Sequence, residues 1–180
     1  MIKVNNYNLK EIVRDNIKKY GPNADLNHLD TSEITDMSAL FFGMDFNGDI
    51  SKWDVSHVKN MRCMFFNNKI FNQDIGKWDV HNVINMSRMF VGCDFNQDIS
   101  EWDIHNVENM SFMFNGSKFN QDLSKWKIND EVDIHQMLWE DNYYDQEITW
   151  DVDLKKIFFL SYNDYMERRK LKVLSNLCVL

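Results

Sequence analysis

The sequence contains no apolar run approaching the roughly 18 residues of a transmembrane helix, so no segment is predicted to cross a bilayer. Basic residues are also in the minority: 20 Lys and Arg stand against 28 Asp and Glu, and the net charge is −8. A nucleic-acid binder needs a basic patch to displace counterions from phosphates, and an anionic membrane attracts the same charge. We therefore expect neither partner. Residues 1–7 lack the apolar core of a signal peptide, which predicts a cytoplasmic protein unless an export signal has been removed.

Cysteine is scarce, and the cysteines present do not follow the spacing of a metal site. The three are Cys63, Cys93 and Cys178, and they occupy unrelated positions in the sequence pattern described below. We therefore predict free thiols and no disulfide. The sequence also has no nucleophile elbow, phosphate loop or metalloprotease motif. We expect no enzyme activity and no cofactor.

What the chain does contain is a repeated tryptophan. The four copies are spaced 25, 24 and 24 residues apart, and each ends a segment of the type Phe-Asn-Gln-Asp-Ile-Ser-Lys-Trp: they are Trp53, Trp78, Trp102 and Trp126. A fixed period in this range is typical of a stacked solenoid, in which each unit buries its apolar face against its neighbours. Solenoids usually act through extended surfaces, so the repeat favours a binding function.

One repeat predicts a strand followed by a short helical turn. The apolar spacing of Ile50, Trp53 and Val55 fits a leucine-rich-repeat strand, whose side chains alternate between two faces. In the segment 60–65, Met61, Met64 and Phe65 share one face of a helical turn. We therefore predict an α/β repeat solenoid of the leucine-rich-repeat type, with a parallel β-sheet on one face and helical turns on the other. The tryptophans should form a buried column, beside columns of methionine (61, 86, 110) and phenylalanine (65, 90, 114).

The chain of 180 residues is predicted to be one domain with helical caps at both ends. Residues 1–21 form an N-terminal cap, in which a helix over 8–20 carries an apolar stripe and stops at Gly21-Pro22. Residues 22–141 hold about five repeats. Residues 142–180 form a C-terminal helical cap, with one or two helices between 154 and 177.

The units Phe-Asn-Gln-Asp-Ile-Ser-x-Trp-Asp-Val and Asn-Val-x-Asn-Met-Ser-x-Met-Phe resemble the repeats of BspA-like surface proteins. These leucine-rich-repeat relatives are known from bacteria, mycoplasmas, some protists and large DNA viruses. The resemblance covers about two thirds of the chain. It implies a solenoid used for binding, often in adhesion or host contact, and a location at the cell surface or outside the cell.

The residues that flank the buried strand positions should point outward from the predicted sheet. They include a mixed set of charges that could complement a protein partner. The predicted partner-binding residues are Lys52, Asp54, Lys77, Asp79, His81, Glu101, Asp103, His105, Lys125 and Lys127. The alternative is that these charges only keep an exposed face soluble.

Two further patterns permit a metal but favour a plainer interpretation. Asp79 and His81 stack on Asp103 and His105 in the next repeat, which could hold a divalent metal or simply pair each histidine with its carboxylate. The column Asp49, Asp74, Asp98 and Asp122 could hold calcium, but Asp at a turn commonly accepts hydrogen bonds from nearby backbone N–H groups. The Gly-rich nonapeptide of calcium-binding β-solenoids is missing. We therefore predict no metal.

The sequence thus favours a monomeric, non-catalytic module that binds another protein through its sheet face. Three alternatives remain open: a secreted or surface adhesin for host cells or matrix, an acidic cytosolic binder of the immunity-protein type, and a metal-binding protein.

Overall fold

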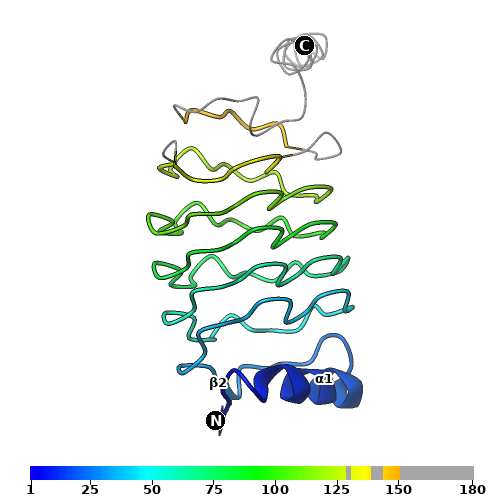
Figure 1. The fold of residues 1–180 in the computed structure, drawn as a ribbon. Coiled ribbons are helices and arrows are strands. Elements are labelled where there is room, and N and C mark those ends of the chain that lie inside the picture. The colour runs from blue at the N-terminus through cyan, green and yellow to red at the C-terminus, as the bar shows by residue number, and fades with distance from the viewer. Residues whose placement is uncertain (129–130, 139–143, 151–180) are drawn as a thin grey trace.

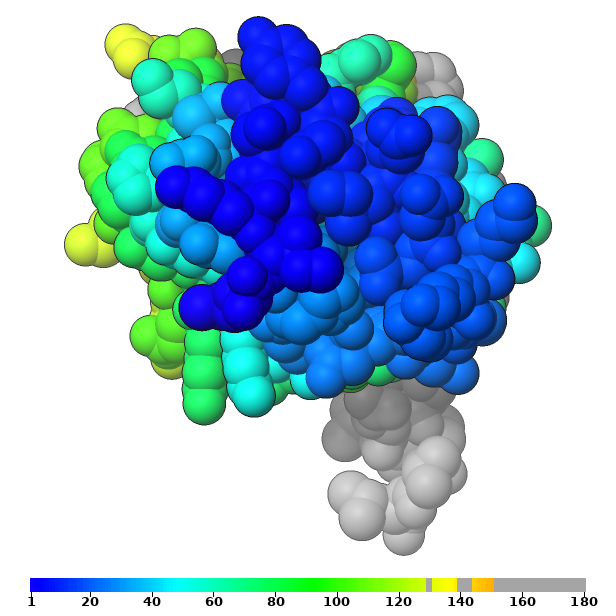
Figure 2. Space-filling model, turned by 90° about the horizontal axis from the view of Figure 1, so that it is seen from below, coloured from blue at the N-terminus to red at the C-terminus, as the bar shows by residue number. Residues whose placement is uncertain are grey.

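A computed structural model describes residues 1–128, 131–138 and 144–150. The chain winds into successive coils that lie one above another, with the N-terminus at the lower end (Figure 1). Seen from that end, the first residues of the chain lie across the bottom of the stack (Figure 2). No helix among the described residues is long and apolar enough to cross a membrane.

The predicted N-terminal helix is present as α1 (Leu9–Tyr20). Leu9 and Val13 are buried against the first coil, and Gly21 ends the helix with φ 86° and an N–H that donates to the Ile17 carbonyl at 2.8 Å. Tyr20 is 61% exposed, so the apolar stripe of the helix is shorter than predicted. The structure adds a pairing that the sequence did not predict, because β1 (Ile2–Lys3) lies parallel to β2 (Leu29–Asp30).

Backbone hydrogen bonds join each coil to the next along one side of the stack. Isolated parallel bridges link five equivalent positions in order: Asp36, Asn60, Asn85, Asn109 and Asp133. Beyond each bridge, alternate backbone N–H groups donate to carbonyls of the next coil in the chain. Met61 donates to Asn85 at 2.8 Å, Cys63 to Ser87 at 3.0 Å and Phe65 to Met89 at 2.9 Å. We call this side the turn ladder; it comprises residues 36–43, 60–67, 85–92, 109–116 and 133–138.

The turn ladder replaces the predicted helical turns. Its backbone does bend back locally, since Met64 N–H donates to the Met61 carbonyl at 3.1 Å. However, the coils have a positive φ at two equivalent positions. The first comprises Ala39, Cys63, Arg88, Phe112 and Gln136, and the second, four residues later, comprises Gly43, Asn67, Gly92 and Gly116. An α-helix satisfies its N–H groups internally. Here the left-handed residues instead turn alternate N–H groups toward the next coil, so that stacking replaces helical hydrogen bonding.

The opposite side of each coil differs from the predicted sheet. Among the described residues, β1 and β2 are the only strands, and Ile50 to Val55 and its equivalents form none. Indole N–H groups make the contact between coils instead. Trp78 donates to the Ile50 carbonyl at 3.2 Å, and Trp102 donates to the Ile75 carbonyl at 3.1 Å. The leucine-rich-repeat class of the stack therefore stays a prediction.

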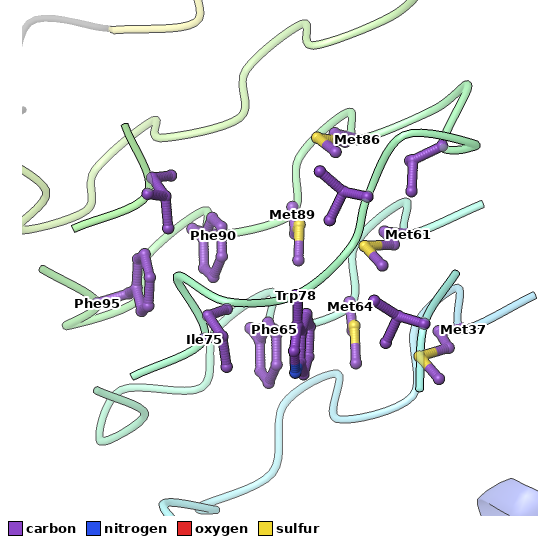
Figure 3. Packing of buried hydrophobic residues seen from close by; sticks show 14 of the residues in the cluster. Met37, Met61, Met64, Phe65, Ile75, Trp78, Met86, Met89, Phe90 and Phe95 are labelled. Carbon is purple, nitrogen blue, oxygen red and sulfur yellow. The ribbon is translucent and has the colours of Figure 1, made fainter. Parts of the chain in front are cut away.

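The core is a set of columns that run through the stack. The four repeat tryptophans are only 3–4% exposed, which confirms that they are buried. The rings of Phe41, Phe65, Phe90 and Phe114 stack at 5.3, 5.5 and 5.7 Å between centroids. Met61 and Met86 lie at the same place in neighbouring coils (Figure 3). Each layer thus buries its rings against the layers above and below it.

The tryptophan column continues beyond the predicted repeats. Trp150 is buried, donates its N–H to the Leu123 carbonyl at 3.0 Å and stacks on Trp126. It lies within the segment 142–180 that the sequence predicts as a cap. The helices expected between 154 and 177 fall outside the described residues.

Candidate partner-binding face

Aspartates hold the turns at the edge of each coil. In the column that suggested calcium, a carboxylate oxygen accepts the N–H two residues further on: Ser51 to Asp49 at 2.9 Å, Gly76 to Asp74 at 3.0 Å, Ser100 to Asp98 at 2.9 Å and Ser124 to Asp122 at 2.7 Å. These contacts confirm the turn-capping interpretation. Among the residues described, no three His, Cys, Asp or Glu side chains converge as metal ligands would.

A second column of capped turns contains five of the predicted site residues. Asp54, Asp79 and Asp103 accept N–H groups from Ser56, His81 and His105 at 3.0, 3.4 and 3.2 Å. The Ser56 hydroxyl also donates to Asp54 and lowers the pKa of that carboxyl. The His105 ring has the same effect on the pKa of Asp103. The Asp54 and Asp103 carboxylates are therefore held as anions at fixed places on the surface.

All ten predicted site residues lie at the surface, in turns instead of strands. Nine of them are exposed and His81 is half-buried. We call this set the charged face; it consists of Lys52, Asp54, Lys77, Asp79, His81, Glu101, Asp103, His105, Lys125 and Lys127. Lys125 forms an ion pair with Glu101 of the preceding coil. Lys52, Lys77 and Lys127 form no ion pair with any described residue, so three cations remain available on this face.

The two histidines of the charged face have different surroundings. Each pairs with its own aspartate, His81 Nδ1 with Asp79 at 2.7 Å and His105 Nδ1 with Asp103 at 2.8 Å. This confirms the plainer of the two interpretations of the Asp-x-His pattern. Asn82 Nδ2 also lies 2.8 Å from His81 Nε2 and so donates to it. No described group contacts Nε2 of His105.

A shallow pocket of about 240 Å³ opens on the charged face between two coils. Asp103 and His105 line it on one coil, and Lys125 and Lys127 on the next; Trp102, Ile104 and Trp126 also line it. The pocket therefore brings four of the ten predicted residues together. Lys52 and Asp54 lie two coils away and take no part in it.

The sequence did not identify the amides that support this face. Asn82 Nδ2 donates to the Ser56 carbonyl at 2.7 Å, and Asn106 Nδ2 donates to the His81 carbonyl at 2.8 Å. Both bonds join one coil to the one before it. The signal was an Asn directly after each His, in His81-Asn82 and His105-Asn106. A second amide column joins the coils with the opposite polarity, because the side-chain oxygens of Asn47, Asn72 and Asn96 accept the backbone N–H groups of Asn72, Asn96 and Asn120.

A family model described as "Mycoplasma protein of unknown function, DUF285" matches residues 7–94 and 85–164. The chain belongs to this family. DUF285 covers BspA-like surface repeat proteins, which agrees with the resemblance noted in the sequence. No curated protein and no solved structure matches this DUF285 chain. Both matched ranges contain tryptophan repeats, and the second extends past Trp150.

Proposed function

We propose that this DUF285 protein is a non-catalytic module that binds another protein through the charged face, on a stack of the leucine-rich-repeat type. The supporting observation is the way the charges are held. Each aspartate is fixed by backbone N–H groups, and the stacking of coils repeats it at a regular spacing. Rigid, ordered charges lose little entropy on binding and give an interface specificity.

The distribution of apolar side chains supports a protein partner over a small molecule. The large rings of the repeat are buried in the core, and the pocket on the charged face is shallow and small. Small-molecule sites are usually enclosed and mostly apolar, with volumes of roughly 300–1,000 Å³. A broad surface with one shallow depression fits a protein contact better.

The proposal is tested by affinity capture from the native source with a charged-face variant that preserves the turns. Asp79→Asn and Asp103→Asn keep the accepting oxygen, as Asn60 does in the turn ladder by accepting the Arg62 N–H. His81→Ser copies Ser56, and Lys77→Ala removes a cation. We expect the captured partner to be lost or to bind about tenfold or more weakly, as when central charged contacts are removed.

The matched control changes the net charge by the same +1 at exposed positions away from the charged face: Asp15→Asn, Asp45→Asn and Lys69→Ala. This control should capture the partner as the unmodified protein does. Equal capture by the charged-face variant, at unchanged thermal stability, would show that the binding surface lies elsewhere.

The family match favours a second candidate, an adhesin at the cell surface. It predicts that the protein on intact cells of the native source is cleaved by added protease and labelled by antibody. Protection from both reagents until the cells are lysed would exclude an adhesin.

A further inference from the structure

The charge pattern of the repeats changes abruptly between the Trp102 and Trp126 coils. The two earlier coils each place one lysine beside one aspartate, as in Lys52 with Asp54. The Trp102 coil instead carries two acids, Glu101 and Asp103. The Trp126 coil carries two bases, Lys125 and Lys127, and Lys127 stands where the other coils have aspartate. The pocket of about 240 Å³ lies at this change.

The two lysines of the pocket differ in what they can still bind. Lys125 forms an ion pair with Glu101, so its charge is largely offset. Lys127 is exposed and makes no ion pair or hydrogen bond with any described residue. Lys127 is therefore the cation of the pocket that has no ion-pair partner among the described residues, although the Asp103 carboxylate also lines the pocket and the whole protein has a net charge of −8.

His105 supplies a second group that can contact an anion. Its Nδ1 is held by Asp103 at 2.8 Å, which leaves Nε2 without a described contact. When both ring nitrogens carry protons, Nε2 becomes a donor. His81 lacks this capacity, because its Nε2 already accepts from Asn82. The two histidines thus form a matched pair in which only one can bind.

We propose that this pocket is a subsite for the side-chain carboxylate of an Asp or Glu on the partner protein, bound between Lys127 Nζ and His105 Nε2. The inference rests on the proposed function, since it describes one contact within that interface. A single carboxylate matches the one available cation and the one available ring nitrogen. The aspartates around the pocket would repel a strongly acidic surface, so the remaining contacts of the partner should be basic or neutral.

A carboxylate at Nε2 requires a proton on that nitrogen, so binding at this site is coupled to protonation of the His105 ring. Below about pH 4 the carboxylate of the ligand is itself protonated and binding is lost.

The probe is N-acetylglutamate N-methylamide, added to the full chain and followed by NMR signals of the histidine rings. We expect the NMR signals of the His105 ring to shift saturably, with a dissociation constant in the millimolar range, and the signals of His81 to change little. Lys127→Asp, which restores the residue found in the other coils, should weaken binding about tenfold, as loss of a charge-assisted hydrogen bond does. Lys69→Ala, at an exposed position away from the charged face, serves as the control and should leave binding unchanged.

Three results would overturn the subsite: an equal response from N-acetylglutamine N-methylamide, an unchanged affinity in Lys127→Asp, or tighter binding of inorganic phosphate than of the glutamate probe. None of them depends on capturing the partner. The opposite result is that the glutamate probe binds His105 and Lys127, but the charged-face variant captures the partner as well as the unmodified protein does. In that case the proposed interface is wrong and the carboxylate site remains.

Discussion

At the scale of single residues, each of the four repeat tryptophans (Trp53, Trp78, Trp102 and Trp126) has two roles. Its ring fills the core, and its indole N–H satisfies a carbonyl of the preceding coil, as Trp102 does for Ile75 at 3.1 Å. Phenylalanine keeps most of the ring but removes one of the two donors to that carbonyl, which also accepts the Trp78 backbone N–H at 3.1 Å. We expect Trp102→Phe to lower the free energy of unfolding by about 0.5–1.5 kcal/mol, measured by urea denaturation.

The comparison variant Trp102→Ala also removes the ring, and it should lower the free energy of unfolding by about 3–5 kcal/mol. If Trp102→Phe proved as stable as the unmodified protein, the indole bond would contribute nothing, and ring burial alone would explain the repeat.

The capped aspartates make stability depend on pH. Backbone N–H groups of the residues two positions on lower the pKa of Asp49, Asp98 and Asp122 below the ordinary value. A carboxyl with a lowered folded-state pKa stabilises the fold above its unfolded value of about 3.9, and this contribution is lost as the pH falls through the folded value. The melting temperature should therefore fall steeply below about pH 4.

Asp98→Asn separates the charge from the turn. The amide oxygen can still accept the Ser100 N–H, but it does not titrate, so this variant should lose less stability between pH 7 and pH 3 than the unmodified protein. Thermal melts at both pH values provide the measurement. An identical loss of thermal stability between pH 7 and pH 3 in the two proteins would mean that Asp98 does not contribute to the pH dependence.

At the scale of the element, the left-handed residues of the turn ladder are the strained positions. Ala39 has φ 50°, and Gly43 four residues later has φ 63° with nothing within 4 Å of an added Cβ. The left-handed region costs a non-glycine residue about 1–2 kcal/mol. We expect Ala39→Gly to raise the free energy of unfolding by up to about 1 kcal/mol and Gly43→Ala to lower it by a similar amount. Urea midpoints of the two variants should move in opposite directions.

The same element shows where prediction from the sequence stops. The spacing of Met61, Met64 and Phe65 fits a helical turn and also fits the observed turns, in which the Met64 N–H donates to the Met61 carbonyl three residues back. What separates them is the positive φ of Cys63, a residue with no turn propensity of its own. The neighbouring coils decide this conformation, since they supply the acceptors for the N–H groups that it redirects.

Features that depend on one residue type recurring at a fixed spacing could be predicted from the sequence. Burial of the tryptophans and stacking of Phe65 on Phe90 followed from the repeat, and α1 followed from its apolar stripe and Gly21. On the charged face, exposure was predictable, whereas the pairing of Lys125 with Glu101 depends on how closely the coils stack.

The sequence did not predict Trp150 as a repeat tryptophan, although its spacing is regular. Trp150 stands 24 residues after Trp126, but only Thr149 separates it from Ile148, where two residues separate Trp126 from Leu123. This shortened motif conceals the repeat at the level of the sequence. The indole bond to Leu123 reveals it in the structure.

At the scale of the whole molecule, each coil contacts mainly the coils next to it. The turn ladder, the indole bonds and the asparagine columns all join consecutive coils. In such a stack, stability is approximately a sum of units and interfaces between neighbours. It follows that one complete repeat can be removed if the register of the remaining coils is kept.

Deleting residues 85–108 tests this property, because it joins Ile84 directly to Asn109, which occupies the same place in its coil as Asn85. The coil of Trp78 then stacks on that of Trp126 through the same contacts. We expect one cooperative urea transition with a lower midpoint and a smaller slope, since less surface is exposed on unfolding. Deleting only residues 85–96 places unlike positions of neighbouring coils above each other. The rings and turn-ladder donors of this variant then meet the wrong partners, so its urea transition should lose cooperativity. If both deletions behaved alike, the stacking register would not be what holds the coils together.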